Sequence, residues 1–270
     1  MTAIAVTIAG SDSGGGAGIQ ADLKTFSALG VYGASVIAAL TAQNTKGVTA
    51  IHDVPPAFVT AQIDAVFSDL AVNAVKIGML SHPDVIAAVA DGLAKFRQTR
   101  VVLDPVMVAT SGDRLLVPEA IEVLRTVLIP KATVITPNLP EAAALLETAV
   151  AQTESEMKDQ GEKLIAMGAK AVLMKGGHAS GAESVDLLIE PNAVARLVAE
   201  RINTRNTHGT GCTLSSAIAA GLAKGLPLAE AVREAKAYVT AAIKASGQLE
   251  IGHGHGPVHH FHHWWTEEKD

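Results

Sequence analysis

Short apolar runs rich in Val, Ile and Ala recur along the chain and alternate with longer segments of helical length. Runs of three to eight apolar residues flanked by polar or glycine-containing segments are typical of strands buried on both faces. The pattern predicts seven such strands, at Ile4–Ala9, Ala34–Leu40, Ala74–Ile77, Val101–Leu103, Thr133–Ile135, Ala171–Met174 and Val185–Ile189.

The segments between these runs predict helices, and several of them begin at or near proline, as helices often do. Alternation of strands and helices predicts an α/β fold: a mainly parallel sheet with helices on both faces. No linker divides the chain, so a single domain over residues 1–270 is expected. The predicted helices are Ala17–Leu29, Pro56–Asp69, Pro83–Phe96, Pro118–Val127, Glu154–Met167, Gly211–Lys224 and Pro227–Ser246.

Charge and cysteine content narrow the functional class. The formal net charge is −6, with 21 basic and 27 acidic residues, and the basic residues are scattered singly. This distribution argues against nucleic acid or an anionic membrane as a partner. A single cysteine cannot form an internal disulfide, and the N-terminus lacks the pattern of a signal peptide, so a cytoplasmic location is expected.

The uncharged stretch Thr25–Thr45 is long enough to cross a bilayer. It contains Gly30, Gly33, Gln43 and Asn44, and the turn signal at Gly30 divides it into a helix end and a short apolar run. We therefore interpret it as a buried helix and strand.

Polar and glycine-rich residues follow most of the predicted strands. Because ligands of open α/β sheets bind beyond the carboxyl ends of the strands, these residues are the first candidates for a site. They are Gly10–Gly18, Thr41–Asn44, Asp104–Pro105, Thr136–Glu141 and Lys175–His178.

The first of these segments formally matches a dinucleotide-binding pattern at Gly16–Ala21. The acidic residue that such a site needs after the second strand is absent before Asp53. The glycines can instead serve a tight turn or the close approach of a small ligand, and we favour the small ligand. A P-loop is excluded because the chain contains no Gly-Lys dipeptide.

The segment His208–Ser216, HGTGCTLSS, opens a predicted helix with two glycines and small polar residues. Free backbone N–H groups at such a start, together with the helix dipole, favour an anion. The alternative is a glycine-capped buried helix, and spacing alone does not separate the two. Cys212 stands where the dipole is expected to lower a thiol pKa, so it is a candidate base or nucleophile, although lone cysteines are often buried hydrophobes.

Asp104, Asn138, Glu141 and Lys175 supply oxygen ligands and one cation at strand ends. This set suits a magnesium-bound phosphate chain, because magnesium uses few carboxylates and keeps its waters. Each residue also has a structural explanation: Asp104 as a turn former, Glu141 as a first-turn dipole partner and Lys175 as a surface charge. Only their joint placement favours a functional role.

Three long motifs then occur together and in order: AGSDSGGGAGIQADLKTF at Ala9–Phe26, VLMKGGH at Val172–His178, and HGTGCTLSS at His208–Ser216. With them the chain resembles the hydroxymethylpyrimidine/phosphomethylpyrimidine kinases of thiamine biosynthesis, in the ribokinase-like superfamily. The resemblance implies a three-layer α/β/α sandwich, ATP with Mg²⁺, and a cytoplasmic homodimer. It also implies two successive phosphoryl transfers to 4-amino-5-hydroxymethyl-2-methylpyrimidine.

The resemblance also implies a role for individual positions. Residues 209–212 form an anion hole for the transferred phosphoryl group, and Lys175 meets the ATP phosphates. Asn138 and Glu141 act near magnesium through water, with Asp104 in support. Gln43 reads the pyrimidine edge. The implied set is catalytic Gly209, Thr210, Gly211, Cys212 and Lys175; nucleotide and metal residues Asp104, Asn138, Glu141, Lys175 and Thr210; and substrate residues Gln43, Asp22, Gly10 and Ala17.

Six of the ten histidines lie between His253 and His263. Such a tract suggests a metal site or a tag, but its irregular spacing, interrupted by Phe261, favours a packed or interface-forming C-terminus. 

Three rival functions remain at this level. A pyridoxal kinase of the same superfamily acts on a similar hydroxymethyl group, and a catalytically idle binder of vitamin precursors keeps the same pocket. A thiol acyltransferase that uses Cys212 requires a base histidine nearby, and sequence alone does not place the neighbouring His208.

Overall fold

The computed structural model describes residues 1–107, 116–177 and 182–265. Within these residues the chain forms one nine-stranded sheet with the spatial order β3-β2-β1-β4-β5-β6-β7-β8-β9. The strands are β1 (Ile4–Asp12), β2 (Tyr32–Asn44), β3 (Gly47–Asp53), β4 (Ala74–Ile77), β5 (Val101–Leu103), β6 (Val134–Ile135), β7 (Val172–Lys175), β8 (Glu183–Glu190) and β9 (Ala193–Glu200).

The centre of this sheet is parallel, as predicted. Strand β1 pairs in parallel with β2 and β4, and the parallel pairing continues through β5 and β6 to β7. The antiparallel strands lie at the two sides: β3 beside β2, and β8 and β9 beyond β7. The carboxyl ends of the parallel strands therefore share one edge, where the polar segments were expected to gather.

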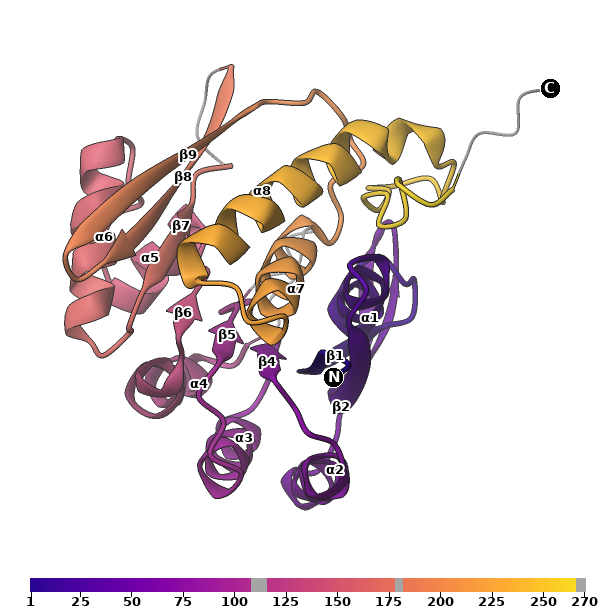
Figure 1. The fold of residues 1–270 in the computed structure, drawn as a ribbon, viewed down its shortest axis with the longest axis vertical. Helices are drawn as coiled ribbons and strands as arrows, with labels where there is room; N and C mark the ends of the chain where they lie inside the picture. The colour runs from indigo at the N-terminus through magenta and orange to yellow at the C-terminus, as the bar shows by residue number, and fades with distance from the viewer. Residues whose placement is uncertain (108–115, 178–181, 266–270) are drawn as a thin grey trace.

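Helices cover both faces of the sheet (Figure 1). Helices α1, α7 and α8 lie on one face, and α2 to α6 lie on the other. This arrangement confirms the predicted three-layer α/β/α sandwich. The helical segments are α1 (Gly18–Ala28), α2 (Pro56–Asp69), α3 (Pro83–Lys95), α4 (Pro118–Val123), η1 (Leu124–Leu128), η2 (Ile129–Lys131), α5 (Leu139–Leu146), α6 (Glu154–Ala166), α7 (Thr210–Ala223), α8 (Leu228–Lys244) and η3 (Ala245–Gln248).

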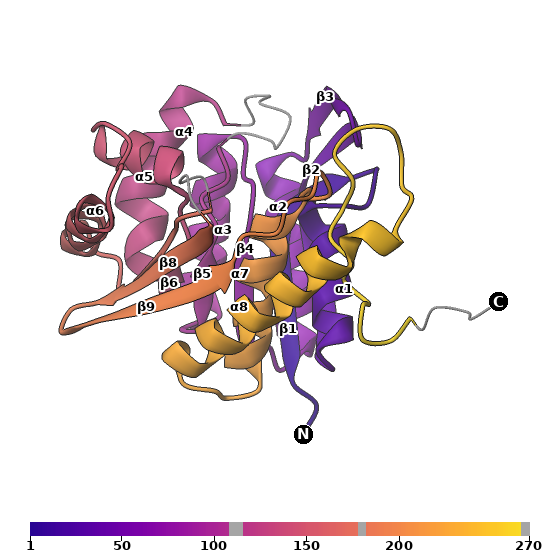
Figure 2. The ribbon, with the colours of Figure 1, turned by 90° about the horizontal axis from the view of Figure 1, so that it is seen from above.

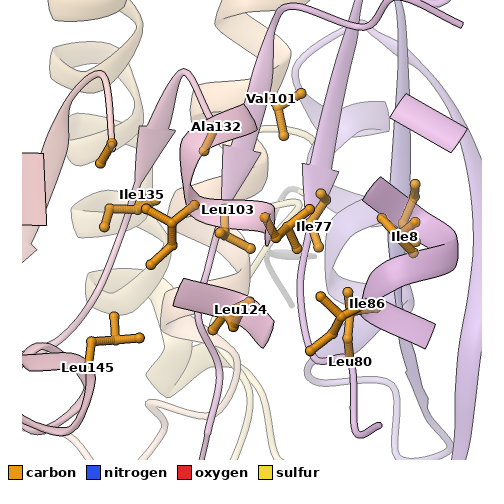
Figure 3. Close-up of a cluster of buried hydrophobic side chains, with 14 of the residues drawn as sticks. Ile8, Ile77, Leu80, Ile86, Val101, Leu103, Leu124, Ala132, Ile135 and Leu145 are labelled. Atoms are coloured by element: carbon orange, nitrogen blue, oxygen red, sulfur yellow. The ribbon is translucent and has the colours of Figure 1, made fainter. Parts of the chain in front are cut away.

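Each face of the sheet has its own hydrophobic core. Figure 3 shows the larger one, where Ile8, Ile77 and Leu103 of the sheet meet Ile86 of α3 and Leu145 of α5. These side chains are at most 1% exposed. Because close-packed interiors resist deformation, the strand ends are held in fixed positions relative to one another.

Four elements differ from the sequence prediction. The prediction missed β3 and β9, because these edge strands are largely exposed and carry polar residues in place of a buried apolar run. It also stopped the second strand at Leu40, whereas β2 continues to Asn44. Gln43 therefore belongs to a hairpin and pairs with Val48 of β3. For the short helix α5, only its start near Glu141 was expected, and its extent was not.

The histidine-rich C-terminal segment packs on the domain, as the sequence favoured. It runs beside the β2–β3 hairpin (Figure 2), where the His255 N–H donates to the Thr45 carbonyl at 2.8 Å. Further along, Trp264 Nε1 donates to the Ala28 carbonyl at 3.1 Å. In the described part of the chain, no helix combines the length and apolarity that crossing a bilayer requires.

Candidate active site

A cavity of about 750 Å³ opens at the carboxyl ends of the parallel strands. Its walls come from segments that are far apart in sequence, which the sheet brings to one edge. All but one of the residues expected at the site line it: Gly10, Ala17, Gln43, Asp104, Asn138, Glu141, Lys175, Gly209, Thr210, Gly211 and Cys212. Asp22 is the exception. His178 of the second motif lies outside the described residues.

Lys175 is the cationic centre of the cavity. It is the last residue of β7, and its Nζ lies 2.8 Å from Asp104 Oδ1 and 3.8 Å from Glu141 Oε2. Asp104 is only 1% exposed and also accepts hydrogen bonds from Thr136 Oγ1 and Ser215 Oγ. Burial acts to raise the pKa of Asp104, but the charges of Lys175 and Lys76 outweigh it and hold that pKa below its usual value. Lys175 is therefore not a solvated surface charge, and Asp104 is more than a turn former.

Asn138 and Glu141 combine a structural and a chemical role. The Asn138 side chain accepts from the Glu141 N–H, and Glu141 Oε2 accepts from the Asn138 N–H, so the two form the capping box of α5. The expected first-turn role of Glu141 is therefore present. Burial, despite the nearby Lys175, raises its pKa to about 7.

The donor set fits magnesium that is held mainly by phosphate and water. Among the described residues no three His, Cys, Asp or Glu side chains cluster closely enough to form a protein cage for a metal. Glu141, with its raised pKa, is a carboxylate that gains from a nearby cation. Few carboxylates with retained waters are the usual environment of magnesium at phosphate sites.

The start of α7 presents unpaired backbone donors to the cavity. Gly209 has a φ of 79°, and a Cβ built there would lie 1.9 Å from the Gly16 carbonyl oxygen, so only glycine fits. Within the described chain, the N–H groups of Gly209, Gly211 and Cys212 donate to no acceptor. A Cβ on Gly211 would lie 3.3 Å from Lys175 Nζ, which places these donors beside the ammonium group. The anion-site interpretation is therefore favoured over a plain glycine cap.

Cys212 contradicts one prediction. The sequence suggested a lowered thiol pKa at the helix start, but burial raises it to about 11. The Lys76 ammonium and the Gly18 N–H oppose this rise, and Asp22 and Asp104 add to it. Desolvation thus outweighs the neighbouring ammonium and N–H groups, and Cys212 is a thiol in the free protein at neutral pH.

Lys76 is a site residue that the sequence analysis missed. It lines the cavity yet is 0% exposed, and its Nζ lies 2.8 Å from Asp22 Oδ2. Burial acts to lower its pKa, but Asp22 and the other anionic groups raise it above the usual range. A lysine within an otherwise apolar strand, Ala74–Ile77, was the available signal.

Asp22 does not take the expected place beside a substrate hydroxyl. Its two carboxylate oxygens accept from Thr7, Ser216 and Lys76 at 2.6 to 2.8 Å, and the residue is 0% exposed. Asp22 lies on α1 and bonds to Ser216 of α7 and Lys76 of β4, so it links these three elements. It reaches the cavity only through Lys76, which lines it.

Asp12, which the sequence analysis left without a role, pairs with His208 and organises the glycine-rich segment. Asp12 accepts from the N–H groups of Gly14, Gly16 and Ala17 and from His208 Nε2, all within 3.0 Å. Burial acts to raise the pKa of Asp12, but these hydrogen bonds lower it. The amides of this loop are thus occupied by a protein carboxylate, which argues against a phosphate-binding or dinucleotide-binding loop.

The position of His208 also bears on the thiol acyltransferase alternative. Its Nε2 is bonded to Asp12, and no histidine is hydrogen-bonded to Cys212 in the part of the chain that the structure describes. The geometry therefore lacks the paired base that thiol catalysis requires.

The far end of the cavity has an apolar surface beside the ion pair of Lys236 and Asp186. It extends between β9 and α8, where Ile202, Val239 and Ile243 line it together with Leu214 of α7. This part was not foreseen, because its residues belong to an unpredicted edge strand, the loop that follows it and ordinary helix faces. The cavity thus joins an apolar chamber to a charged centre.

Comparisons with known proteins agree with this geometry. A family model described as phosphomethylpyrimidine kinase matches residues 12–259. A hydroxymethylpyrimidine/phosphomethylpyrimidine kinase of Rhizobium meliloti (strain 1021) is 65% identical over 267 residues, which cover 99% of this chain and all of the relative. The thiamine biosynthesis bifunctional protein ThiED of Geobacter sulfurreducens is 54% identical over 255 residues, covering 94% of this chain and 51% of that protein.

A solved structure gives the same fold with ligands. The pyridoxal kinase of Staphylococcus aureus in complex with AMP-PCP and pyridoxal superposes with a TM-score of 0.90 and 32% sequence identity. The match covers 98% of this chain and 95% of that one.

The raised pKa of Glu141 predicts a pH-dependent effect of Glu141→Gln. The folded pKa, about 7, lies above the usual 4.5, so the stability contributed by protonated Glu141 is present below pH 4.5 and is lost as pH rises through 7. Glutamine stays neutral. From pH 5 to pH 8, the unfolding free energy of the variant, measured with urea in metal-free buffer, should rise relative to that of the wild type by about 1 to 3 kcal/mol. Glu119→Gln, at an exposed first-turn position of α4, is the control; an equal difference at both pH values contradicts the assignment.

The buried pair Lys76–Asp22 predicts strongly non-additive stability effects. Lys76→Met or Asp22→Leu alone leaves an uncompensated buried charge and should cost about 3 to 5 kcal/mol of unfolding free energy. The double variant removes both charges and should regain most of that loss. Chemical denaturation of the four proteins measures the coupling. Losses that simply add would show that the two side chains do not neutralise each other.

Proposed function

The chain belongs to the phosphomethylpyrimidine kinase family, and from that premise we propose that it phosphorylates 4-amino-5-hydroxymethyl-2-methylpyrimidine in thiamine biosynthesis. The product of the first transfer is the monophosphate, and a second transfer gives the diphosphate. ATP is the donor. The observation that carries this proposal is that Lys175 lies beside the N–H groups of Gly209, Gly211 and Cys212, which have no acceptor among the described residues, between the apolar and polar ends of one cavity.

The apolar end suits the adenine ring of ATP. Ile202, Val239 and Ile243 offer an apolar chamber that leads toward Lys175, and base rings are commonly bound by such surfaces. The likeness to a kinase solved with AMP-PCP supports the binding of a nucleotide by this chain. In this arrangement Lys175 meets the phosphates, and Thr210 and its neighbours receive the transferred group.

The polar end suits the pyrimidine. Gly10 and Ala17 line this end together with Gln43, whose amide can both accept from an amino group and donate to a ring nitrogen. The hydroxymethyl group then points toward Cys212 and the start of α7.

Catalysis follows from positioning and charge neutralisation, since phosphoryl transfer leaves little covalent work for the protein. The backbone donors at the start of α7 and the Lys175 ammonium stabilise charge on the phosphoryl oxygens in the transition state. Asp104 holds Lys175 in place. Glu141 and Asn138 are placed to hold Mg²⁺ through water, and the ion when bound neutralises phosphate charge.

Cys212 is proposed to take the hydroxyl proton in the first transfer. The first acceptor is a neutral alcohol, which loses a proton during the reaction, whereas the second is a phosphate monoester that is largely ionised at neutral pH. The Lys76 ammonium favours the thiolate, so raising the pH populates the base.

The resemblance also supports a single-domain chain over residues 1–270 that acts as a cytoplasmic homodimer. The single domain, the cytoplasmic location and the homodimer are all part of the proposal.

Pyridoxal is the second candidate substrate. The likeness to the Staphylococcus aureus pyridoxal kinase favours it, at a TM-score of 0.90. Pyridoxal also presents a hydroxymethyl group on a nitrogen heteroaromatic ring.

Mass spectrometry of reaction products tests the proposed function. The purified protein is incubated with ATP, Mg²⁺ and either the aminopyrimidine alcohol, pyridoxal or no acceptor. We expect the mono- and diphosphates of the aminopyrimidine, in that order. Phosphorylation of pyridoxal alone would support the second candidate, and no product from either alcohol would leave a binder without catalysis.

The pKa of Cys212 predicts different pH profiles for the two transfers. With a thiol pKa of about 11, the thiolate fraction rises about tenfold for each pH unit between 7 and 9. The kcat/KM of the alcohol should rise in parallel, and that of the monophosphate should not. Cys212→Ala should abolish the rise and slow the alcohol by about 100-fold or more at pH 9. A flat alcohol profile in the wild type, or equal losses in both transfers, would limit Cys212 to shaping the anion hole.

A further inference from the structure

The Gln43 amide lies between two groups of known hydrogen-bonding character. The structure places its Oε1 3.1 Å from Thr41 Oγ1 and its Nε2 3.4 Å from His208 Nε2. The Gln43 backbone is fixed as well, because its N–H donates to Ser13 Oγ and its carbonyl accepts from that hydroxyl, both at 2.8 Å. A half-turn about the last side-chain bond exchanges the amide oxygen and nitrogen, so the surrounding hydrogen bonds decide which atom faces which neighbour.

Thr41 selects the orientation in which the amide nitrogen of Gln43 faces its hydroxyl oxygen. Thr41 Oγ1 lies 2.8 Å from the Ser11 carbonyl oxygen, and a carbonyl can only accept. The single hydroxyl proton of Thr41 is therefore used there. What remains on Thr41 Oγ1 is acceptor capacity, which Gln43 satisfies only with its NH₂ group.

The His208 side requires the amide oxygen. His208 Nε2 lies 2.8 Å from Asp12 Oδ2, and Asp12 also receives the N–H groups of Gly14, Gly16 and Ala17. The pKa of Asp12 is lowered, so it is an ionised acceptor, and His208 Nε2 carries the proton that it donates. An amide NH₂ facing that N–H would oppose donor to donor, whereas the amide oxygen brings no proton against it. Both neighbours therefore select the same orientation, with the amide nitrogen toward Thr41 and the amide oxygen toward His208.

We propose that Thr41 and His208 lock the Gln43 amide in one orientation, and that this lock makes the site select a 4-amino pyrimidine over its 4-oxo counterpart. The inference rests on the proposed function of the cavity. In the locked amide one N–H and the oxygen lone pairs remain for a ligand. A 4-aminopyrimidine offers a donor at the amino group and an acceptor at N3. The 4-oxo compound offers the reverse pattern, an acceptor at the carbonyl and a donor at N3.

A glutamine that rotates freely serves both patterns, because its own pattern reverses with a half-turn. A locked glutamine serves one and leaves two mismatched groups against the other. Buried mismatches of this kind are the strongest source of discrimination between similar substrates. Thr41 and His208 are thus positioning residues for specificity, acting through Gln43.

The test compares kcat/KM for two alcohols, 4-amino-5-hydroxymethyl-2-methylpyrimidine and its 4-oxo analogue. We expect the wild type to prefer the amino compound by about 100-fold or more. His208→Leu should reduce this preference at least tenfold, and Thr41→Val should act in the same direction. His208→Gln, whose terminal NH₂ can still donate to Asp12, should keep the preference within about threefold. His253→Leu applies the same change at an exposed histidine and should leave the preference unchanged.

A ratio separates specificity from general damage, because a purely structural defect lowers the rates of both alcohols together. The lock is overturned if the wild type uses both alcohols within about threefold, a result that needs no variant. It is also overturned if His208→Leu and Thr41→Val both leave the ratio unchanged. Failure of the wild type to phosphorylate either pyrimidine would contradict the proposed function instead.

Discussion

The cavity depends on the neutralisation of two lysines, Lys76 within β4 and Lys175 at the end of β7. Lys76 is fully buried and Lys175 is largely so. An ammonium group removed from water is costly unless a partner compensates it, and Asp22 and Asp104 are those partners. Because Asp22 lies on α1 and also binds Ser216 of α7, the same ion pair that satisfies Lys76 fixes two helices on the sheet. The start of α7 is thereby directed at Lys175.

Two glycine-rich segments meet at this place and use their amides in opposite ways. The segment after β1 directs its N–H groups at the carboxylate of Asp12, whereas at the start of α7 the N–H groups of Gly209, Gly211 and Cys212 have no acceptor among the described residues. The first is a closed structural loop that supports the pyrimidine side. The second remains an open anion site. His208 joins them, since its side chain binds Asp12 and its backbone leads directly into the anion site.

Much of the fold and most of the site could be predicted from the sequence. Apolar runs located the buried strands, and residues that follow them, such as Lys175, line the cavity. The errors concern contacts between distant residues. Asp22 was assigned to the substrate because nothing local reveals its bond to Ser216, 194 positions away. The pKa of Cys212 was given the wrong sign, because the helix start is visible in the sequence and the depth of burial is not. Lys76 and Asp12 were missed because their partners, Asp22 and His208, lie far away in the sequence.

The central claim is that Lys175 and the start of α7 form a site for phosphate and leave the apolar chamber to the base. Calorimetric titration of ADP and of adenosine into the wild type, Lys175→Met and the exposed control Lys158→Met tests it directly, with Mg²⁺ present throughout. The account predicts that Lys175→Met weakens ADP binding at least tenfold and leaves adenosine binding within about twofold. Lys158→Met should change neither. Unchanged ADP affinity in Lys175→Met, or an equal loss for adenosine, would contradict the account.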